Sequence, residues 1–281
     1  MRLDVQLIWN IKDIIMKLSF SKTLLSMAIL VGLTACGSGG GSGSTAPRTL
    51  SSSDAGAAYI AKTNNHGEIT SVTHSIIKNK NDISFGENYI SINGEKFPMP
   101  ADAIQEAEHQ FYQGLNAIKN ATDLDIEDIS GVGIYIVYDK GAAFYLGNPT
   151  KDMPISGSAT YLGGAMLFEN KEFLAPLKEG KTKLIADFSN KKLDGSLVFS
   201  DISPINISAN IDQNNFTGRA SSNSLSPGHV EGKFYGKNAA SISGIVKSDD
   251  LQGNKGWIAI FSGADKKHFT PQGLRDLGIQ E

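Results

Sequence analysis

From residue 184 to residue 247 this chain alternates apolar and polar side chains with hardly a break. Leu184, Ala186 and Phe188 share one face of the pattern. The same period recurs in the segments 193–199, 205–211, 216–220, 230–237 and 242–247. A period of two is that of a β-strand with one buried face, because successive side chains point to opposite sides of the strand. The sequence therefore predicts strands that each bury one face.

Two flanking segments, Ile155–Phe168 and Trp257–Phe261, raise the number of predicted strands to eight. The connections are short and turn-like, including Asn190-Lys191, Gln213-Asn214-Asn215 and Lys237-Asn238. Turns of this length join neighbouring antiparallel strands. We therefore predict an up-and-down antiparallel barrel over residues 155–265, whose interior is just wide enough to be filled by side chains. Glycines on the apolar face are expected to permit close packing there.

Alternation alone leaves open which face points outward. In a transmembrane barrel the apolar face would contact lipid and the polar face would line the lumen. Several of the predicted strands are short, and no aromatic girdles mark their ends. These features favour a water-exposed barrel with an apolar interior.

Residues 55–154 have a mixed pattern and are predicted to form a separate α+β ligand-recognition domain. Its predicted strands are Ala57–Lys62, Ile69–Lys78, Asp82–Ile92, Gly131–Tyr138 and Ala142–Leu146. A helix is predicted over 101–119, where apolar residues recur at spacings of three and four. The predicted fold class is thus mainly β with a small α+β part: this N-terminal domain, the eight-stranded antiparallel soluble barrel, and a C-terminal tail over 266–281.

The start of the chain has the features of an export signal. Lys17 and Lys22 precede an apolar run of about ten residues, 24–33, which is too short to cross a hydrocarbon core of about 30 Å as a helix but suits a signal peptide. The pattern is better counted from Met16 than from Met1, so Met16 is the predicted start. The signal peptide is predicted to end at residue 35.

Cys36 is the only cysteine of the chain. It ends the run Leu33-Thr34-Ala35-Cys36, which resembles the bacterial lipobox, where the new N-terminal cysteine is acylated. The alternative is an ordinary secretory peptide with an incidental cysteine. Residues 37–53 are rich in Gly, Ser and Thr and are predicted to form, with Cys36, a flexible tether that ends near residue 54. Because Gly rather than Asp stands at position 37, the resemblance implies an outer-membrane destination.

Composition and motifs predict a protein without enzymatic activity. The formal net charge is −3, which disfavours nucleic acid as a partner. A single cysteine used for lipidation leaves no thiolate for catalysis or for a zinc site. Motifs of serine hydrolases, zinc proteases and nucleotide-binding loops are absent from the sequence. No resident cofactor or metal is therefore expected, although haem stays an alternative.

Three histidines are the candidate axial ligands if haem binds. His66 stands in the turn-like run Asn64-Asn65-His66-Gly67, His74 in a predicted strand, and His109 on the polar face of the predicted helix. No pair of histidines has the i, i+4 spacing of a helical metal site. The alternative for each is an ordinary surface or turn histidine.

An apolar and aromatic group in the N-terminal domain is the candidate partner-binding surface. It consists of Phe97, Met99, Phe111 and Tyr112. Loops on a rigid scaffold commonly carry recognition, which favours this domain as the binding part. The alternative is that these residues pack as core where the chain enters the helix.

The run 228–244, GHVEGKFYGKNAASISG, is similar to a barrel stretch of the Slam-dependent surface lipoproteins. That group includes the transferrin-binding protein B type, the factor H-binding protein type and the haemophilins. Ile155–Ser158 with Gly163-Gly164 resembles the strand that opens the barrel in these proteins. The resemblance covers residues 155–262, while the first domain is similar only in layout.

The resemblance implies a non-enzymatic protein that is anchored by lipid to the outer membrane, exposed on the cell surface and exported by a Slam-type translocator. It implies that a host protein or host surface ligand is bound by the N-terminal domain during colonisation. The alternative within the group is the capture of haem or of another host metal source. None of the histidines matches a haem ligand of the family.

Overall fold

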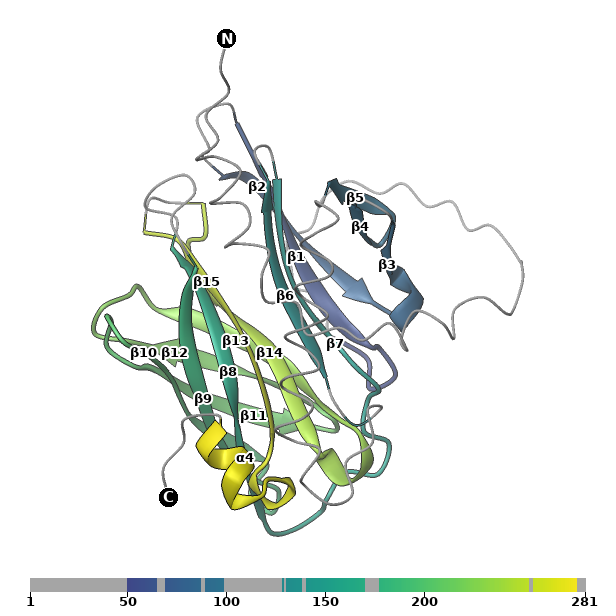
Figure 1. The fold of residues 1–281 in the computed structure, drawn as a ribbon, viewed down its shortest axis with the longest axis vertical. Helices are drawn as coiled ribbons and strands as arrows, with labels where there is room; N and C mark the ends of the chain where they lie inside the picture. The colour runs from purple at the N-terminus through teal and green to yellow at the C-terminus, as the bar shows by residue number, and fades with distance from the viewer. Residues whose placement is uncertain are drawn as a thin grey trace, which may run out of the picture.

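The computed structural model describes residues 50–64, 69–86, 89–98, 128, 130–137, 140–169, 177–252 and 255–276. Its larger part is a closed eight-stranded antiparallel barrel (Figure 1). The barrel strands are β8 (Ser158–Glu169), β9 (Lys178–Asp187), β10 (Lys192–Phe199), β11 (Ile205–Asp212), β12 (Asn215–Ser221), β13 (Gly228–Tyr235), β14 (Ser241–Ser248) and β15 (Trp257–Asp265). This confirms the predicted fold class.

The barrel is built from neighbours in sequence and closes where its last strand meets its first. β15 pairs with β8 from Trp257↔Glu169 to Asp265↔Tyr161. The predicted turns lie at strand ends, and Lys191, Gln213 and Asn238 adopt positive φ there. Tight hairpin turns require such left-handed positions because they match the twist of the flanking strands. Between β13 and β14 the chain adds the short 3-10 turn η3 (Lys237–Ala239).

The apolar faces of all eight strands point into the barrel. Phe234 lies at the centre of the filling, with ring centroids 5.8 Å from Tyr161, 5.8 Å from Phe188 and 5.5 Å from Phe216. Gly232 makes room for this cluster, because a Cβ there would stand 2.2 Å from the Phe216 ring. The interior is therefore filled by side chains, and the interpretation in which the apolar face meets lipid is wrong.

Residues before the barrel form two further sheets. A four-stranded sheet has the order β2-β1-β7-β6, with β1 (Gly56–Thr63), β2 (Ile69–Ile77), β6 (Gly131–Val137) and β7 (Lys140–Leu146). A three-stranded sheet has the order β3-β4-β5, with β3 (Ile83–Phe85), β4 (Tyr89–Ile92) and β5 (Glu95–Pro98), preceded by the 3-10 turn η1 (Lys80–Asp82).

The single strand predicted over Asp82–Ile92 is wrong, because the chain folds back on itself there. β3 and β4 are the arms of a hairpin, with Phe85 paired to Ile90. A second turn with Asn93 and Gly94 at positive φ then leads into β5, which the alternation did not reveal. The helix predicted over 101–119 lies outside the described residues.

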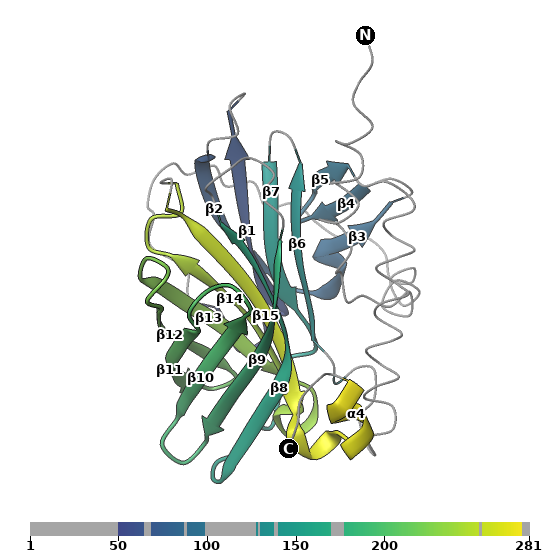
Figure 2. The same cartoon turned by 60° about the vertical axis from the view of Figure 1, so that its left-hand side comes forward.

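The molecule has three layers, and the four-stranded sheet is the middle one (Figure 2). One of its faces packs on the outside of the barrel, where Tyr59, Val132 and Tyr145 meet Ile245, Ile258 and Ile260. Its other face packs on the small sheet, where Ile60 and Phe144 meet Ile90 and Phe97. A sheet buried on both sides explains why β1 and β7 are almost continuously apolar.

The segment predicted as a C-terminal tail contains structured residues. The 3-10 turn η4 (Lys266–His268) and the short helix α4 (Pro271–Asp276) follow β15 and lie at one end of the barrel (Figures 1 and 2). Among the described residues, no helix is long and apolar enough to cross a membrane.

Candidate functional site

The most unusual chemistry of this protein lies where the middle sheet meets the barrel. β13 points Val230 and Phe234 into the barrel core, so His229, Glu231, Lys233 and Tyr235 project from its outer side. The middle sheet covers that side, leaving Glu231 5% and Lys233 0% exposed. A buried carboxylate and a buried ammonium are costly unless each finds partners.

Glu231 is the acceptor for three side chains of the middle sheet. The Tyr59 hydroxyl donates to its Oε2 over 3.2 Å, and the Tyr145 hydroxyl donates to its Oε1 over 3.4 Å. His74 Nε2 lies 3.0 Å from Oε1, and the His74 ring contacts the Tyr59 ring in a tilted arrangement with centroids 4.8 Å apart. We call Tyr59, His74, Tyr145 and Glu231 the junction cluster. It joins β1, β2 and β7 to β13.

Burial and the nearby carboxylate fix the protonation of the tyrosines. Desolvation, together with Glu231, raises the pKa of Tyr59 and of Tyr145 well above the usual range for tyrosine. Both phenols therefore stay protonated donors at any physiological pH. Desolvation also lowers the pKa of His229, with Glu231 opposing that shift. The cluster is thus suited to holding two layers together in one geometry.

Lys233 holds the first described residues against the barrel. Its Nζ donates to the backbone carbonyl of Ser51 over 2.9 Å and to the side-chain oxygens of Asn214 and Asn215. The two amides reach the flanking carbonyls: Asn215 Nδ2 donates to Leu50 over 3.1 Å and Asn214 Nδ2 to Ser52 over 2.8 Å. We call Asn214, Asn215 and Lys233 the clamp, because it binds three successive backbone carbonyls.

Burial lowers the pKa of Lys233 to about 8, and the nearby Asp54 carboxylate opposes the shift. The Asp54 side chain accepts from the Ser51 backbone N–H over 2.7 Å, which closes a turn in the clamped segment. The Tyr235 hydroxyl adds a bond to the Ala55 carbonyl over 3.0 Å. The chain leading into β1 is therefore fixed to the outer side of β13 from residue 50 onward.

The candidate haem ligands are not brought together in the described structure. His74 lies in β2 with its side chain 12% exposed, and Glu231 occupies its Nε2. An axial haem ligand needs a free ring nitrogen facing an open slot, so this His74 geometry favours a structural role. His66 and His109 lie outside the described residues. No three His, Cys, Asp or Glu side chains gather as metal ligands within the described ranges.

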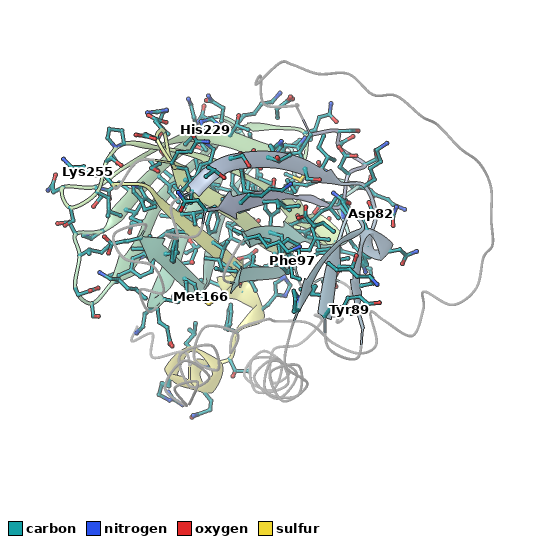
Figure 3. The ribbon with its side chains drawn as sticks, turned by 90° about the horizontal axis from the view of Figure 1, so that it is seen from above. Asp82, Tyr89, Phe97, Met166, His229 and Lys255 are labelled. Atoms are coloured by element: carbon teal, nitrogen blue, oxygen red, sulfur yellow. The ribbon has the colours of Figure 1, made fainter. Side chains whose placement is uncertain are left out.

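Of the candidate partner-binding residues, Phe97 is the one that the structure describes. It is 0% exposed and packs between the small sheet and the middle sheet (Figure 3). Phe97 therefore packs as core in this fold, which agrees with the packing alternative, and its ring is not exposed to a partner. Met99, Phe111, Tyr112 and the lipidation residue Cys36 lie outside the described residues.

The small sheet carries a more accessible aromatic group than Phe97. Tyr89 stands at the outer edge of the molecule (Figure 3), and Lys96 Nζ lies 4.3 Å from its ring centroid. Lys140 Nζ lies 4.7 Å from the centroid of the Phe97 ring. Aromatic side chains next to cations are common at protein interfaces.

Sequence reasoning missed the junction cluster and the clamp. Glu231 and Lys233 stand at the polar positions of an alternating strand, which are normally exposed to solvent. The signal that could have found them is the strongly apolar pattern of β1 and β7, which requires a second surface to pack against. Nothing local to β13 indicates that this surface is its own outer side.

Residues 153–266 match the family described as the C-lobe and N-lobe β-barrels of Tf-binding protein B. The described fold and this match together define the class: a side-chain-filled antiparallel barrel covered on one side by a second sheet. The barrel of this chain is therefore similar to the barrels of transferrin-binding protein B.

Two relatives are similar in sequence. An uncharacterized protein of Haemophilus influenzae is 29% identical over 280 residues, covering 84% of this chain and 96% of the relative. Transferrin-binding protein B of Haemophilus influenzae is 30% identical over 206 residues, covering 54% of this chain and 32% of the relative. The chain thus spans about a third of that transferrin-binding protein.

Solved structures with a similar arrangement include a crystal structure described as a surface lipoprotein. It has a TM-score of 0.48 and 17% identity and covers 76% of this chain and 99% of its own. A transferrin-binding protein B variant from Haemophilus parasuis has a TM-score of 0.46 and 18% identity, covering 74% of this chain and 44% of its own.

Proposed function

We propose that this protein is a non-enzymatic lipoprotein of the bacterial cell surface that binds a host protein. The supporting observation is the match of residues 153–266 to the barrels of transferrin-binding protein B. Barrels of that family belong to a protein named for binding a host protein, and the sequence of this chain offers a lipobox at Cys36. In this proposal residues 1–35 are removed, Cys36 carries the lipids, palmitate among them, and a Slam-type translocator exports the chain.

The layered fold suits such a role because it presents the N-terminal domain on a rigid support. The junction cluster and the apolar contacts of Tyr59 and Tyr145 fix the middle sheet to the barrel. The small sheet then stands on the far side of the middle sheet, away from the barrel (Figure 2). We propose that partner contacts are made from this outer layer, with Tyr89 and Lys96 among them.

In size and layout the chain is also similar to the host-colonisation lipoprotein NilC. This likeness supports colonisation of a host as the setting in which the partner is met.

Surface display is tested by protease treatment of intact cells that express the full chain with or without a Slam-type translocator. We expect cleavage that depends on the translocator, and metabolic labelling with palmitate that is lost in Cys36→Ala. A Cys36→Ala chain that still carries palmitate, or a chain that proteases never reach, would contradict the proposal.

A second candidate function is acquisition of iron from a host source, and the similarity to transferrin-binding protein B favours it. Purified protein is titrated with iron-loaded transferrin and, separately, with haemin. Saturable binding of transferrin would support this function in the form that the relative suggests. A Soret shift with haemin would support the haem alternative, and a flat response to both would exclude both.

A further inference from the structure

Residues 50–52, from which the chain runs back toward residue 36, are bound at one end of the barrel. The clamp binds the carbonyls of residues 50–52 beside the β11–β12 turn. The β9–β10 turn lies at the same end, because Lys192 at the start of β10 pairs with Asn210 near the end of β11. The end of β15 also lies there, because Asp265 pairs with Tyr161 near the start of β8, and η3 and α4 lie at this end too. We call this the tether-side end; it is the lower end of the barrel in Figure 1.

The tether-side end contains an open depression of about 1080 Å³ that Ile155 helps to line. The apolar lining also includes Met153 and Phe269, which are half-buried, and Ala159, Phe188 and Leu274, which are buried. Ile155 is 91% exposed, about twice the exposed fraction of Ile185 or Val198 on the barrel wall. A large aliphatic side chain left this open costs hydration free energy in water and is typical of contact surfaces.

Lys266 and Lys267 line this depression, and further basic side chains lie at the same end of the barrel. The exposed ones include Lys151, Lys191, Lys192, Lys237, Lys267 and Arg275. Several acidic side chains at the same end have partners: Asp265 accepts from Lys267 over 2.7 Å and Asp187 from Asn190 over 2.7 Å, while Asp54 and Asp128 accept from the backbone N–H groups of Ser51 and Lys237. Asp54, Asp128 and Asp265 are buried, and Asp152 and Asp212 are exposed. Among the described side chains of this end, the exposed basic ones therefore outnumber the exposed acidic ones.

The length of chain between the clamp and Cys36 limits where the barrel can stand. Fourteen Cα–Cα steps separate Cys36 from Leu50. At about 3.6 Å each they reach at most about 50 Å, and a flexible chain of that length averages roughly 20 Å end to end. If Cys36 is lipidated, the tether-side end is therefore held within about 50 Å of the lipid headgroups.

We propose that the tether-side end is a lipid-contacting surface, in which Ile155 inserts among the headgroups of an anionic phospholipid layer and the surrounding lysines and Arg275 pair with lipid phosphates. This inference rests on the proposed lipid anchor for its setting. Apolar insertion flanked by basic residues is the general mode of interfacial binding. The tether keeps the surface at high local concentration near the membrane, so weak contacts suffice.

The test uses residues 36–281 with Cys36→Ser, which keeps every described residue and needs no lipid anchor. Ile155→Trp and Val198→Trp are compared in this chain by fluorescence. The remaining tryptophan, Trp257, is buried and reports little of the surface. We expect a blue shift for Trp at 155 when vesicles of phosphatidylcholine with one quarter phosphatidylglycerol are added, and no shift for Trp at 198.

Co-sedimentation with the same vesicles measures the strength of binding. Ile155→Asp should lower the partition coefficient about tenfold or more, because burial of this side chain is lost and a negative charge is added. Lys151→Glu with Arg275→Glu should also lower it by about tenfold. The controls Val198→Asp and Lys183→Glu, both on the exposed wall, should stay within about twofold of the parent.

Three results would overturn the inference: no binding of the parent chain to anionic vesicles, equal binding to vesicles of phosphatidylcholine alone, or equal losses in the control variants. A dimer that Ile155→Asp dissociates in the absence of lipid would assign the surface to a second copy instead. Because the tested chain has no anchor, these results are independent of whether Cys36 is lipidated in cells. Absence of palmitate labelling would contradict the proposed function alone.

Discussion

The two halves of the barrel wall have the same inner side and different outer sides. In β11 every second residue is exposed, from Asn206 to Asp212. In β14 every residue except Lys247 is buried, although its outer positions include Ser241 and Ser243. The first half, β9–β12, faces water, whereas β13–β15 and β8 lie under the middle sheet. A polar residue is inexpensive in the first half and must find a partner in the second.

This difference explains why the charged groups of the covered wall form networks. Glu231 has three donors around it, and Lys233 has three oxygen acceptors. Their counterparts on the open wall, such as Asn206 and Ser208, are solvated and require no partners in the protein. The covered wall therefore determines how the N-terminal domain sits on the barrel.

The largest effect is expected from an unpaired charge in the covered wall. Ile260 is 0% exposed in β15, so Ile260→Asp should cost more than about 4 kcal/mol of unfolding free energy. Ile185→Asp on the open wall, where Ile185 is 46% exposed, should change it by no more than about 0.5 kcal/mol. Urea unfolding measures both. Equal costs would mean that the middle sheet does not cover the wall in solution.

The junction cluster should come next. Glu231→Ala leaves Tyr59, His74 and Tyr145 without their shared acceptor, and we expect a loss of about 3 kcal/mol. Ser208→Ala on the open wall is the matched control and should stay within about 0.5 kcal/mol. The unfolding curves of the two variants decide this; a Glu231→Ala protein as stable as the control would show that the cluster contributes little.

A pH dependence follows from the lowered pKa of Lys233. Because that pKa is about 8 in the folded protein and about 10.4 in an unfolded chain, the unfolded chain binds more protons between these values. The contribution of Lys233 to stability therefore rises with pH through this window, by about 2 kcal/mol from pH 7.5 to pH 9.5.

The measurement compares the parent with Lys233→Met at both pH values. The other titrating groups cancel in the difference between the two proteins. We expect the free energy of unfolding of the parent to rise relative to that of Lys233→Met as the pH rises. A difference that is flat or falls with pH would mean that the ammonium is as well solvated in the clamp as in water.

The smallest effect is expected from an ion pair at the exposed surface. Arg219 Nη1 lies 2.9 Å from Asp249 Oδ1, and both side chains are more than half exposed. Water and salt screen such pairs, so Arg219→Ala should leave the unfolding midpoint within the scatter of replicates at physiological salt. A clear shift, confirmed by a double-mutant cycle with Asp249→Ala, would indicate that this side is also covered in solution.

Much of the barrel could be predicted from the sequence because its information is local. The period of two in Leu193–Phe199 or Ile205–Ile211 specifies a strand and its inner face together. Lys191 and Gln213 have positive φ and stand in turns. In the sequence these turns are short polar runs between the strands that contain Asn and no Gly. A closed barrel then follows from hairpins that leave no free edge.

The N-terminal domain was less predictable. Ile83–Phe85 and Tyr89–Ile92 look like one strand in the sequence, and only the pairing Phe85↔Ile90 shows that they are two. The sequence around Phe97 suggests an aromatic side chain that contacts a partner, yet this side chain packs between two sheets. Both outcomes depend on which sheet lies opposite, which local sequence does not encode.

The sequence by itself determined that the second half of this protein is a barrel with an apolar interior, since strand, turn and inner face are all set by neighbouring residues. Only the tertiary structure decided that one side of the barrel is covered. That choice turned Glu231 and Lys233 from surface residues into buried ones, because their burial comes from residues about 90 to 180 positions away in the chain. Contacts between such distant segments leave no periodic pattern.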